Sequence, residues 1–535
     1  MLGGCHPVYH PPGGEFLTPA HSPRRRELLL AAPALLSSCT LGRGRASRPN
    51  ILFAIADDQS WPGALSLAEG TLETPALSRL AREGVTLTHS FCAAPSCTPS
   101  RSAVLTGRNV WQVEEGGVLY GTLPAKYPLF PRLLEEAGYL VGHTGKGWSP
   151  GNWQAGGLLR HPNGKSFNTR RLASPPPGIN ANDYAANFDD FLAARGPGQP
   201  FCFWFGGTEP HRVYDQGIGR RSGKRVEDAR PPPFWPDSEV IRGDILDYCA
   251  EVEWFDSHLG RMVRSLERAS ELDNTLIVAT SDNGMPFPRA KVNLYDWGLR
   301  MPLAIRWGAR VSGGRRVDDF VSHIDFAPTF LEAAGLAAPP GAAGRSLLPL
   351  LRADDPGRDC AFAALERHTM CRPDGATYPV RALRTRRFLY LRNFAPDRWP
   401  TGGPDFVSSN RTFHGDVDEC PTKTFLVEPA NQRRYPRQYE LCFGKRPPEE
   451  LYDIDSDPAQ VRNLAADPGH AAMKRQLWSR LGSHLRRTGD PRIEGRDPWQ
   501  SYVYHQTAGY GASFNRSLPE EARQRARQLP THKPE

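Results

Sequence analysis

The stretch "NILFAIADD" (residues 50–58) is a short apolar run that ends in two acidic residues. Three more segments share this design, an apolar run followed by polar or glycine residues: "YLVGHTGKG" (139–147), "PFCFWFGG" (200–207) and "NTLIVATSDNG" (274–284). Apolar runs of this length are typical of strands that are buried on both faces of a sheet. Together they predict a large buried sheet.

Helical patterns lie between these runs, at residues 74–83, 131–137 and 245–269. The alternation predicts an α/β fold with a mixed, mostly parallel sheet flanked by helices. In such sheets, ligands bind beyond the carboxyl ends of the strands. The polar residues at or just after these predicted ends are Asp57, Asp58, Lys146, His211, Asp282 and Asn283.

Composition divides the chain into parts. In order, they are a leader and linker (1–47), a large α/β domain (48–353), a smaller C-terminal α+β domain (354–489) and a polar tail (490–535). The Pro/Gly-rich stretch 335–344 precedes the boundary between the two domains. The segment "VRALRTRRFLYLRNF" (380–394) has β character and predicts an antiparallel sheet in the smaller domain.

The net charge of +8 and pI near 9.0 of this 535-residue chain favour acidic partners. These are nucleic acid, anionic lipid, and sulfated or phosphorylated substrates. The arginines are scattered and the sequence contains no nucleic-acid-binding motif, so we expect no nucleic-acid partner. No segment reaches the ~18–20 apolar residues of a membrane span.

The leader "SPRRRELLLAAPALLSSCTLG" (22–42) has the shape of a signal peptide. Arg25 and Arg26 fit a twin-arginine signal, and "LSSC" resembles a bacterial lipobox that would place a lipid on Cys39. This pattern predicts passage through an export machinery to the bacterial periplasm or cell envelope, with a lipid anchor as one option. The alternative is a basic tail without a signal function.

Two cysteine pairs flank loop-rich segments, Cys360 with Cys371 and Cys420 with Cys442. Either pair could form a disulfide in an exported protein, because the oxidising environment outside the cytoplasm allows it. The spacing does not determine the connectivity.

Asp57-Asp58 and Asp282-Asn283 are two oxygen-rich pairs, each after a buried strand. Carboxylate and amide oxygens are the ligands that Ca²⁺ and Mg²⁺ prefer. The cysteine and histidine spacing of a zinc site is absent. Ordinary turns at strand ends are the alternative for each pair by itself.

The segment "FCAAPSCTPSRSAVLTGR" (91–108) places Cys97 before a run with helix character. A helix start offers free N–H groups to an anion, and Arg101 adds a forked cation in the first turn. A disulfide, a metal ligand, a nucleophile and a buried small side chain are all open for Cys97. Lys146, His211 and Lys291 add further positive or protonatable groups, which suit a tetrahedral dianion beside a cation. A solvated surface charge is the alternative for each lysine.

The run "CTPSR" (97–101), followed by "LTGR", resembles the sulfatase signature Cys-x-Pro-Ser-Arg. The likeness extends over about residues 48–485, from "NILFAIADDQ" through "TSDNG" to "ELYDIDSDPAQVRNLA". The segments "EPHR", "TSDNGMPFPRAKVNLY", "GRSLLP" and "YPVRALRTRRF" resemble the heparan N-sulfatase branch more than the general arylsulfatases. The resemblance implies an alkaline phosphatase-like fold.

The resemblance also implies that a maturation enzyme converts Cys97 to Cα-formylglycine, using Pro99 and Arg101 for recognition. One hydroxyl of the aldehyde hydrate attacks sulfur, and the second expels sulfate afterwards. The implied ligands of Ca²⁺, with Mg²⁺ less favoured, are Asp57, Asp58, Cys97 in its modified form, Asp282 and Asn283.

The remaining implied roles concern charge and protons. Asp282 is the base for the hydrate, and Arg101 and the cation lower the cost of ionising it. Lys146, His211 and Lys291 hold the sulfuryl oxygens, and His211 or Lys291 protonates the leaving group.

Two positions depart from the family pattern. Trp148 stands where many sulfatases have the histidine of a Lys-x-His motif, which usually helps to release sulfate. His143 is near in sequence but is expected on a different face of its strand. Lys291 stands where the family often has arginine. The lysine keeps the positive charge but lacks the guanidinium group that can donate two parallel hydrogen bonds.

The leading expectation is therefore an exported sulfatase that acts on a sulfated glycan, with N-sulfoglucosamine of heparan-type chains as the favoured substrate. The alternatives are an O-sulfatase, a phosphonate or phosphate ester hydrolase of the same fold, and a non-catalytic glycan-binding surface lipoprotein. The charge-rich segment "ERHTMCRPDGATYPVRALR" predicts a substrate-binding role in the smaller domain, with a solvated loop as the alternative. The residues expected to contact the glycan are Glu366, Arg367, His368, Arg372 and Arg381.

Overall fold

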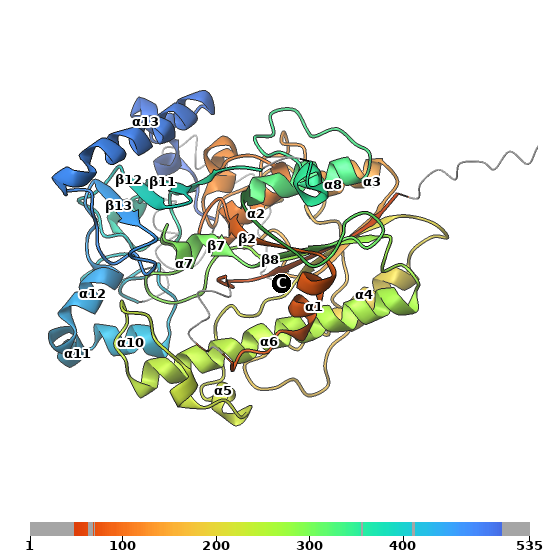
Figure 1. The fold of residues 1–535 in the computed structure, drawn as a ribbon, viewed down its shortest axis with the longest axis horizontal. Coiled ribbons are helices and arrows are strands. Elements are labelled where there is room, and N and C mark those ends of the chain that lie inside the picture. The colour runs from red at the N-terminus through yellow and green to blue at the C-terminus, as the bar shows by residue number, and fades with distance from the viewer. Residues whose placement is uncertain (1–47, 62–67, 69, 355–356, 409–411, 506–535) are drawn as a thin grey trace, which may run out of the picture. The chain divides into compact units, whose positions relative to one another are not determined.

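The computed structural model describes residues 48–61, 68, 70–354, 357–408 and 412–505 (Figure 1). Among these residues, nine strands form one mixed sheet. Its hydrogen-bonded order is β4 (Lys165–Ser166), β3 (Leu140–Gly145), β5 (Phe201–Gly206), β1 (Asn50–Ala56), β6 (Thr275–Ser281), β8 (Leu303–Arg306), β2 (Val85–Phe91) and β7 (Arg300–Met301), and β9 (Arg315–Ser322) also pairs with β2. The five strands from β4 to β6 are parallel, whereas β8 runs antiparallel to β6. The predicted mixed, mostly parallel sheet is confirmed.

The four apolar runs that predicted the sheet become β1, β3, β5 and β6, and these strands are neighbours. Their carboxyl ends are in register: Gly145 pairs with Gly206, and Ala56 pairs with Ser281. The polar residues that follow these ends therefore lie along one edge of the sheet.

Helices cover both faces of this sheet (Figure 1). On one face, the helices are α1 (Pro75–Glu83), α4 (Tyr184–Ala193) and α6 (Glu239–Arg268), and on the other they are α2 (Cys97–Thr106), α3 (Phe130–Glu136), α8 (Phe326–Ala333) and α9 (Leu348–Arg352). Alternate residues of β1 face opposite sides: Leu52 packs with Phe255 of α6, whereas Phe53 contacts Phe326 and Phe330 of α8. Both faces are apolar, which explains why β1 is a continuous apolar run.

Helix α6 begins six residues before the predicted start at residue 245. Ser238 caps it, because its hydroxyl accepts a hydrogen bond from the backbone N–H of Ile241 at 3.3 Å. The first turn carries exposed residues such as Glu239 and Val240, so the apolar pattern alone did not reveal it.

The smaller domain contains an antiparallel sheet in the order β10 (Cys360–Leu365), β11 (Val380–Thr385), β12 (Phe388–Asn393) and β13 (Glu449–Asp453). Helix α13 (Ala471–Arg487) packs on it through Leu477, Leu481 and Leu485. Three short helices precede β13: α10 (Pro421–Val427), α11 (Pro429–Arg434) and α12 (Pro436–Phe443). The predicted antiparallel sheet is thus confirmed.

Residues 490–505, which were expected to begin the polar tail, pack against the rest of the chain. They form two 3₁₀ turns, η8 (Pro491–Glu494) and η9 (Pro498–Ser501), and Trp499 and Tyr504 are fully buried. Residues 506–535 of the predicted tail lie outside the described residues.

The other short elements connect these layers. They are α5 (Ile218–Arg221), α7 (Asp296–Leu299), η2 (Val110–Gln112), η3 (Glu114–Gly117), η4 (Val226–Asp228), η5 (His323–Asp325), η6 (Pro373–Gly375) and η7 (Pro468–His470).

The eight cysteines in the described part of the chain are all free thiols, so neither predicted disulfide forms. Within the described residues, no helix is both long and apolar enough to cross a membrane.

Candidate active site

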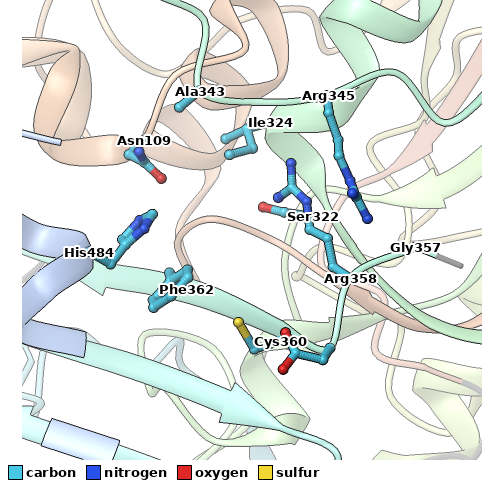
Figure 2. Close-up of a pocket in the computed structure, with 11 residues that line it drawn as sticks. Asn109, Ser322, Ile324, Ala343, Arg345, Gly357, Arg358, Cys360, Phe362 and His484 are labelled. Carbon is cyan, nitrogen blue, oxygen red and sulfur yellow. The ribbon is translucent and has the colours of Figure 1, made fainter. Parts of the chain in front are cut away.

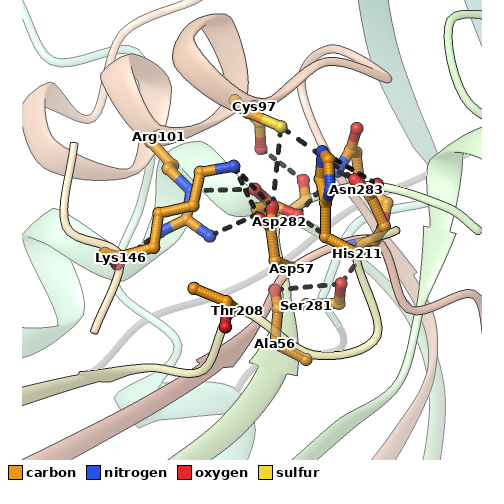
Figure 3. Close-up of polar contacts among 12 residues, drawn as sticks. Ala56, Asp57, Cys97, Arg101, Lys146, Thr208, His211, Ser281, Asp282 and Asn283 are labelled. Atoms are coloured by element: carbon orange, nitrogen blue, oxygen red, sulfur yellow. Dashed lines mark hydrogen bonds and ion pairs between the residues drawn. The ribbon is translucent and has the colours of Figure 1, made fainter. Parts of the chain in front are cut away.

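The candidate site lies where the carboxyl ends of β1 and β6 meet the first turn of α2 (Figure 3). Asp57 and Asp58 follow β1, and Asp282 and Asn283 follow β6. Asp58 has a left-handed φ of 72°, a conformation that aspartate tolerates better than most residues. Cys97 is the first residue of α2, and its Sγ lies 3.5 Å from Asp57 Oδ1 and 4.0 Å from Asp58 Oδ1. The structure thus brings the five predicted ligand residues together.

The Cys97 thiol is only 2% exposed and faces these carboxylates. Burial, together with the negative charge of Asp57, raises the pKa of the Cys97 thiol well above its ordinary value. The neutral thiol is a weak nucleophile, since the thiolate is the reactive form. The position therefore does not favour chemistry by an unmodified cysteine.

Three carboxylates meet at this site. Oxygen atoms of Asp57, Asp58 and Asp282 lie within 4.8 Å of one another. Asn283 donates its amide N–H to Asp58 Oδ1 at 2.8 Å and to Asp282 Oδ1 at 2.6 Å, while its own Oδ1 is buried without a hydrogen-bond partner in the part of the chain that the structure describes. An unpartnered amide oxygen beside three carboxylates fits a hard divalent cation that takes oxygen ligands. The residues present therefore suit Ca²⁺ or Mg²⁺.

Two cationic side chains hold one side of the carboxylate cluster. Arg101 Nε donates to Asp282 Oδ2 at 2.8 Å, and its Nη1 donates to the carbonyl oxygens of Lys146 and Gly147, each at 2.8 Å. Lys146 Nζ contacts both oxygens of Asp57, at 2.8 and 2.6 Å. Burial opposes the charge of Lys146, but Asp57 outweighs it and raises the pKa of the lysine. Lys146 therefore stays protonated.

Lys291 and His211 occupy the other side. Lys291 Nζ donates to Asp58 Oδ2 at 2.7 Å and to Asp418 Oδ2 at 3.1 Å. Burial opposes its charge, but Asp418 and Asp58 raise the pKa of Lys291 well above its usual value. His211 Nδ1 donates to the Arg212 carbonyl at 2.7 Å, which leaves Nε2 3.7 Å from Asp58 Oδ2. Nε2 is therefore free to exchange a proton with a ligand.

A cavity of about 590 Å³ opens onto this cluster. Five of the predicted catalytic and metal-binding residues line it: Asp57, Cys97, Lys146, His211 and Lys291. Its wall also contains polar residues that sequence reasoning missed, namely Tyr120, Asn180, Thr208, Glu209, Arg212, Glu251, Thr369 and Asp418. No pattern around Asp418 or Glu251 marks them, because one is in a loop and the other on the long helix α6. A loop of the smaller domain thus supplies Asp418 to a site on the main sheet.

Of the five residues predicted to contact a glycan, His368 lines the cavity. Its Nδ1 lies 2.8 Å from the hydroxyl of Ser96, the residue before Cys97. Burial lowers the pKa of His368 to about 4, so the imidazole is neutral at pH 7.

The other four residues are bound to protein groups instead of lining the cavity. Arg381 forms ion pairs with Glu366 at 2.7 Å and Asp490 at 2.5 Å. Arg372 pairs with Asp416 at 2.8 Å, and Arg367 Nη2 donates to the Tyr502 carbonyl at 2.8 Å. The many charged residues of this segment are therefore explained by buried ion pairs and hydrogen bonds to residues that are distant in sequence.

Trp148 is buried and does not line the cavity. Its indole N–H donates to the Ser102 hydroxyl at 2.8 Å, and the ring packs in the core of the main domain. His143 stacks on His161 with ring centroids 4.3 Å apart, and neither lines the cavity. Neither Trp148 nor His143 therefore replaces the imidazole of the Lys-x-His motif.

A second cavity, of about 400 Å³, lies between the smaller sheet and the loops after β9 (Figure 2). Its wall includes Asn109, Arg345, Arg358, Phe362 and His484. Arg358 is paired with Asp325 at 2.6 Å, and His484 is stacked on Phe362. None of the predicted site residues lines this cavity.

Residues 49–336, more than half of the chain, match the family model described as Sulfatase. The chain belongs to the sulfatase family. Residues 290–390 of this sulfatase also match the model described as N-sulphoglucosamine sulphohydrolase, C-terminal. The human N-sulphoglucosamine sulphohydrolase is 28% identical over 497 residues, covering 84% of this chain and 92% of the relative. An ulvan-active sulfatase of Formosa agariphila is 25% identical over 495 residues, covering 83% of this chain and 76% of the relative.

Solved structures show the same fold. A protein in complex with its substrate D-glucosamine-2-N,6-O-disulfate superposes with a TM-score of 0.59 at 20% identity, over 84% of this chain and 100% of that one. The phosphonate monoester hydrolase of Agrobacterium radiobacter has a TM-score of 0.56 at 18% identity, over 82% of this chain and 96% of that one. The predicted alkaline phosphatase-like fold and the predicted membership of a hydrolase family, with likeness to the sulfamidase branch, are confirmed.

Proposed function

We propose that this sulfatase removes sulfate from a sulfated glycan, with N-sulfoglucosamine of heparan-type chains as its substrate. The observation that carries the proposal is Cys97 at the start of α2, in one cavity with Lys146, His211 and Lys291 and beside three carboxylates. The match to the C-terminal model of N-sulphoglucosamine sulphohydrolase favours the sulfamate N–S bond over an O-sulfate ester.

The nucleophile in this proposal is a formylglycine made from Cys97. The Cys-Thr-Pro-Ser-Arg run supports this conversion, and the high pKa of the buried thiol argues against a thiolate nucleophile. A maturation enzyme with an external two-electron oxidant would turn the side chain into an aldehyde and release the sulfur as hydrogen sulfide. Water adds to the aldehyde and gives a hydrate with two hydroxyl groups.

Turnover then takes two steps. In the first, one hydroxyl of the hydrate loses its proton to Asp282 and attacks the substrate sulfur, so that an O–S bond forms as the S–N bond breaks. The leaving nitrogen takes a proton from His211, because Lys291 stays protonated beside Asp418 and Asp58. In the second, the other hydroxyl loses its proton and the C–O bond to the sulfate breaks. Sulfate leaves, and the aldehyde is restored.

Asp57, Asp58, Asp282 and Asn283, with residue 97, would hold the Ca²⁺. When bound, the cation supplies positive charge that favours an ionised hydroxyl on residue 97. Lys146 and Lys291 remain protonated and line the cavity, so they can bind sulfuryl oxygens as negative charge develops. The imidazole of His211 also lines the cavity and can exchange the remaining protons.

Export to the periplasm or cell envelope is part of the proposal and depends on the leader. The twin-arginine pattern and Cys39 lie outside the described residues, so lipid anchoring stays a prediction.

The test is the mass of the peptide that contains Cys97, taken from protein produced with a formylglycine-generating enzyme. We expect an aldehyde that reacts with a hydrazide, and release of sulfate from N-sulfoglucosamine. Full activity with an unmodified thiol would overturn the nucleophile. Faster hydrolysis of glucosamine 6-sulfate or of a phosphonate ester would overturn the substrate and leave the nucleophile in place. Glycan binding by the aldehyde-bearing protein without any turnover would favour a non-catalytic binding protein.

A further inference from the structure

Glu251 is a buried carboxyl in the cavity wall that the proposed reaction does not use. It lies on α6, lines the same cavity as Cys97, and is only 1% exposed. Its Oε1 is buried and has no hydrogen-bond partner among the described residues. A buried acceptor without a partner is destabilising, because the hydrogen bonds it made to water in the unfolded chain are not replaced. Since it faces a ligand cavity, a bound ligand is the natural source of the missing partner.

The neighbouring carboxylate, Glu209, shows the contrast. Its Oε1 accepts the backbone N–H of Asn180 at 3.0 Å, and its Oε2 accepts the hydroxyl of Tyr184 at 2.8 Å. Glu209 therefore has its partners within the protein, whereas the Oε1 of Glu251 does not.

The groups around Glu251 determine its charge. Burial, then Glu209 and Asp247, raise the pKa of Glu251 to about 9, and the positive charge of Arg212 offsets only part of this. Tyr214 also interacts electrostatically with Glu251. At neutral pH, Glu251 is thus an uncharged acid, which can donate one hydrogen bond and accept others.

Arg212 adds a second open group to the same wall. Its Nη1 pairs with Asp244 at 2.8 Å, and its Nε donates to the Pro286 carbonyl at 2.9 Å. The guanidinium also stacks between Tyr214 and Phe287, at 4.3 and 4.4 Å from the ring centroids. Its Nη2 is buried and has no hydrogen-bond partner among the described residues. The Arg212 side chain is therefore held in place with one nitrogen, Nη2, left to donate to a ligand.

We propose that Glu251 and Arg212 bind a hydroxyl group of the sugar that carries the sulfate, and so select carbohydrate over small sulfates. A hydroxyl can accept from Arg212 Nη2 and exchange a hydrogen bond with the Glu251 carboxyl. An ammonium group suits this wall less well, because it requires an ionised carboxylate. The inference rests on the proposed function, since it concerns the same cavity.

The test compares two variants on two substrates. Glu251→Leu removes the carboxyl, and Glu251→Gln keeps a donor and an acceptor in nearly the same shape. We expect Glu251→Leu to lower kcat/KM for N-sulfoglucosamine by about tenfold, mainly through KM, and to change kcat/KM for 4-nitrophenyl sulfate less than twofold. Glu251→Gln should keep most of the wild-type value on the sugar. Because the aryl sulfate has no sugar hydroxyl, it should not detect the change.

A pH profile separates recognition from a merely structural role. The ratio of kcat/KM for the sugar to that for the aryl sulfate should fall in the wild type as the pH rises through about 9, where Glu251 ionises. In Glu251→Gln, this ratio should stay flat. Equal losses of kcat/KM on both substrates, or an unchanged ratio of the two kcat/KM values in Glu251→Leu, would overturn this inference. The proposed function would still stand in that case, provided that the enzyme hydrolyses the aryl sulfate. A wild type that hydrolyses neither substrate would overturn both.

Discussion

Two clusters of buried charged residues in this protein differ in how their charges are paired. The catalytic cluster consists of Asp57, Asp58, Asp282, Arg101, Lys146 and Lys291. The C-terminal cluster consists of Glu366, Arg381, Asp490 and Arg492. In the C-terminal cluster, Arg381 lies between the two acids, and Arg492 closes it by pairing with Glu366 at 2.5 Å. Opposite charges therefore alternate along a chain of ion pairs.

The catalytic cluster brings like charges together and leaves atoms open. Its three carboxylates lie within 4.8 Å of one another, and Arg101 Nη2 and the adjacent Asn283 Oδ1 have no hydrogen-bond partners in the described part of the chain. Such an arrangement is costly in a protein interior unless a ligand completes it. Buried charge by itself is therefore not a mark of function. What distinguishes the catalytic cluster is that crowded carboxylates and unsatisfied polar atoms occur together at one cavity.

The sharpest test of this distinction is Cys97→Ala, which removes the proposed nucleophile. We expect kcat/KM to fall by about 10⁴-fold or more, since loss of a nucleophile removes both steps of turnover. Cys97→Ser should be equally inactive, because an unmodified serine would hold the sulfate. Sulfate release is measured beside a thermal melt, which should show a folded protein. Near-normal release by purified Cys97→Ala would contradict the formylglycine proposal.

Cys92→Ala is the matched control for that experiment. Cys92 is also buried, with its thiol 3.5 Å from the Gly298 carbonyl. It does not line the cavity. Its loss should lower stability a little and leave turnover in place.

In the C-terminal cluster, Arg381→Met should act on stability and not on chemistry. Glu366 keeps its pair with Arg492, but Asp490 is left buried without the ion pair to Arg381, and breaking such a pair costs about 3–5 kcal/mol. The denaturant midpoint should fall accordingly, while kcat/KM per folded molecule stays near the wild-type value at low temperature. Arg132→Met, which breaks an exposed pair with Glu136, should change the midpoint little. A loss of kcat/KM without a loss of stability would place Arg381 in substrate binding after all.

Removal of the divalent cation should affect both activity and stability, because the catalytic cluster is incomplete without it. We expect elemental analysis to find one Ca²⁺ per chain and a chelator to abolish turnover. Calcium restored at 100 times its Kd should raise the free energy of unfolding by about 2.7 kcal/mol. Metal-free protein with full activity would contradict the cation site.

The smallest effect is expected for His368→Ala. The neutral imidazole lines the cavity and is hydrogen-bonded to Ser96. Its loss should raise KM for a sulfated disaccharide several-fold, which corresponds to about 1 kcal/mol of binding free energy. A small aryl sulfate, which reaches only the sulfate-binding groups, should be little changed. Equal effects on both substrates would mean that His368 supports the position of α2 instead.

Arg372→Ala is the useful contrast to that variant. Arg372 pairs with Asp416, whose Oδ1 accepts the backbone N–H and the hydroxyl of Thr369 in the cavity wall. Its loss should therefore lower stability, and it should affect the two substrates alike.

The sequence by itself determined the sheet and the position of its chemistry. Apolar runs predicted β1, β3, β5 and β6, because strands buried on both faces must be apolar throughout. Since parallel strands end at one edge, the polar residues after them had to converge, and the structure brings Asp57, Lys146, His211, Asp282 and Cys97 together there. Local patterns sufficed because each of these residues is positioned by its own strand end or helix start.

Only the tertiary structure decided which other charged residues belong to the site. Arg381 and Asp490 are 109 residues apart in sequence, so the charge-rich segment 366–384 could not be distinguished from a glycan-binding loop until its partners were in place. Conversely, Asp418 and Glu251 carry no local signal, yet the fold places both in the cavity wall. Whether a buried charge is paired or left open depends on side chains that are distant along the chain, and only the packed fold brings these side chains together.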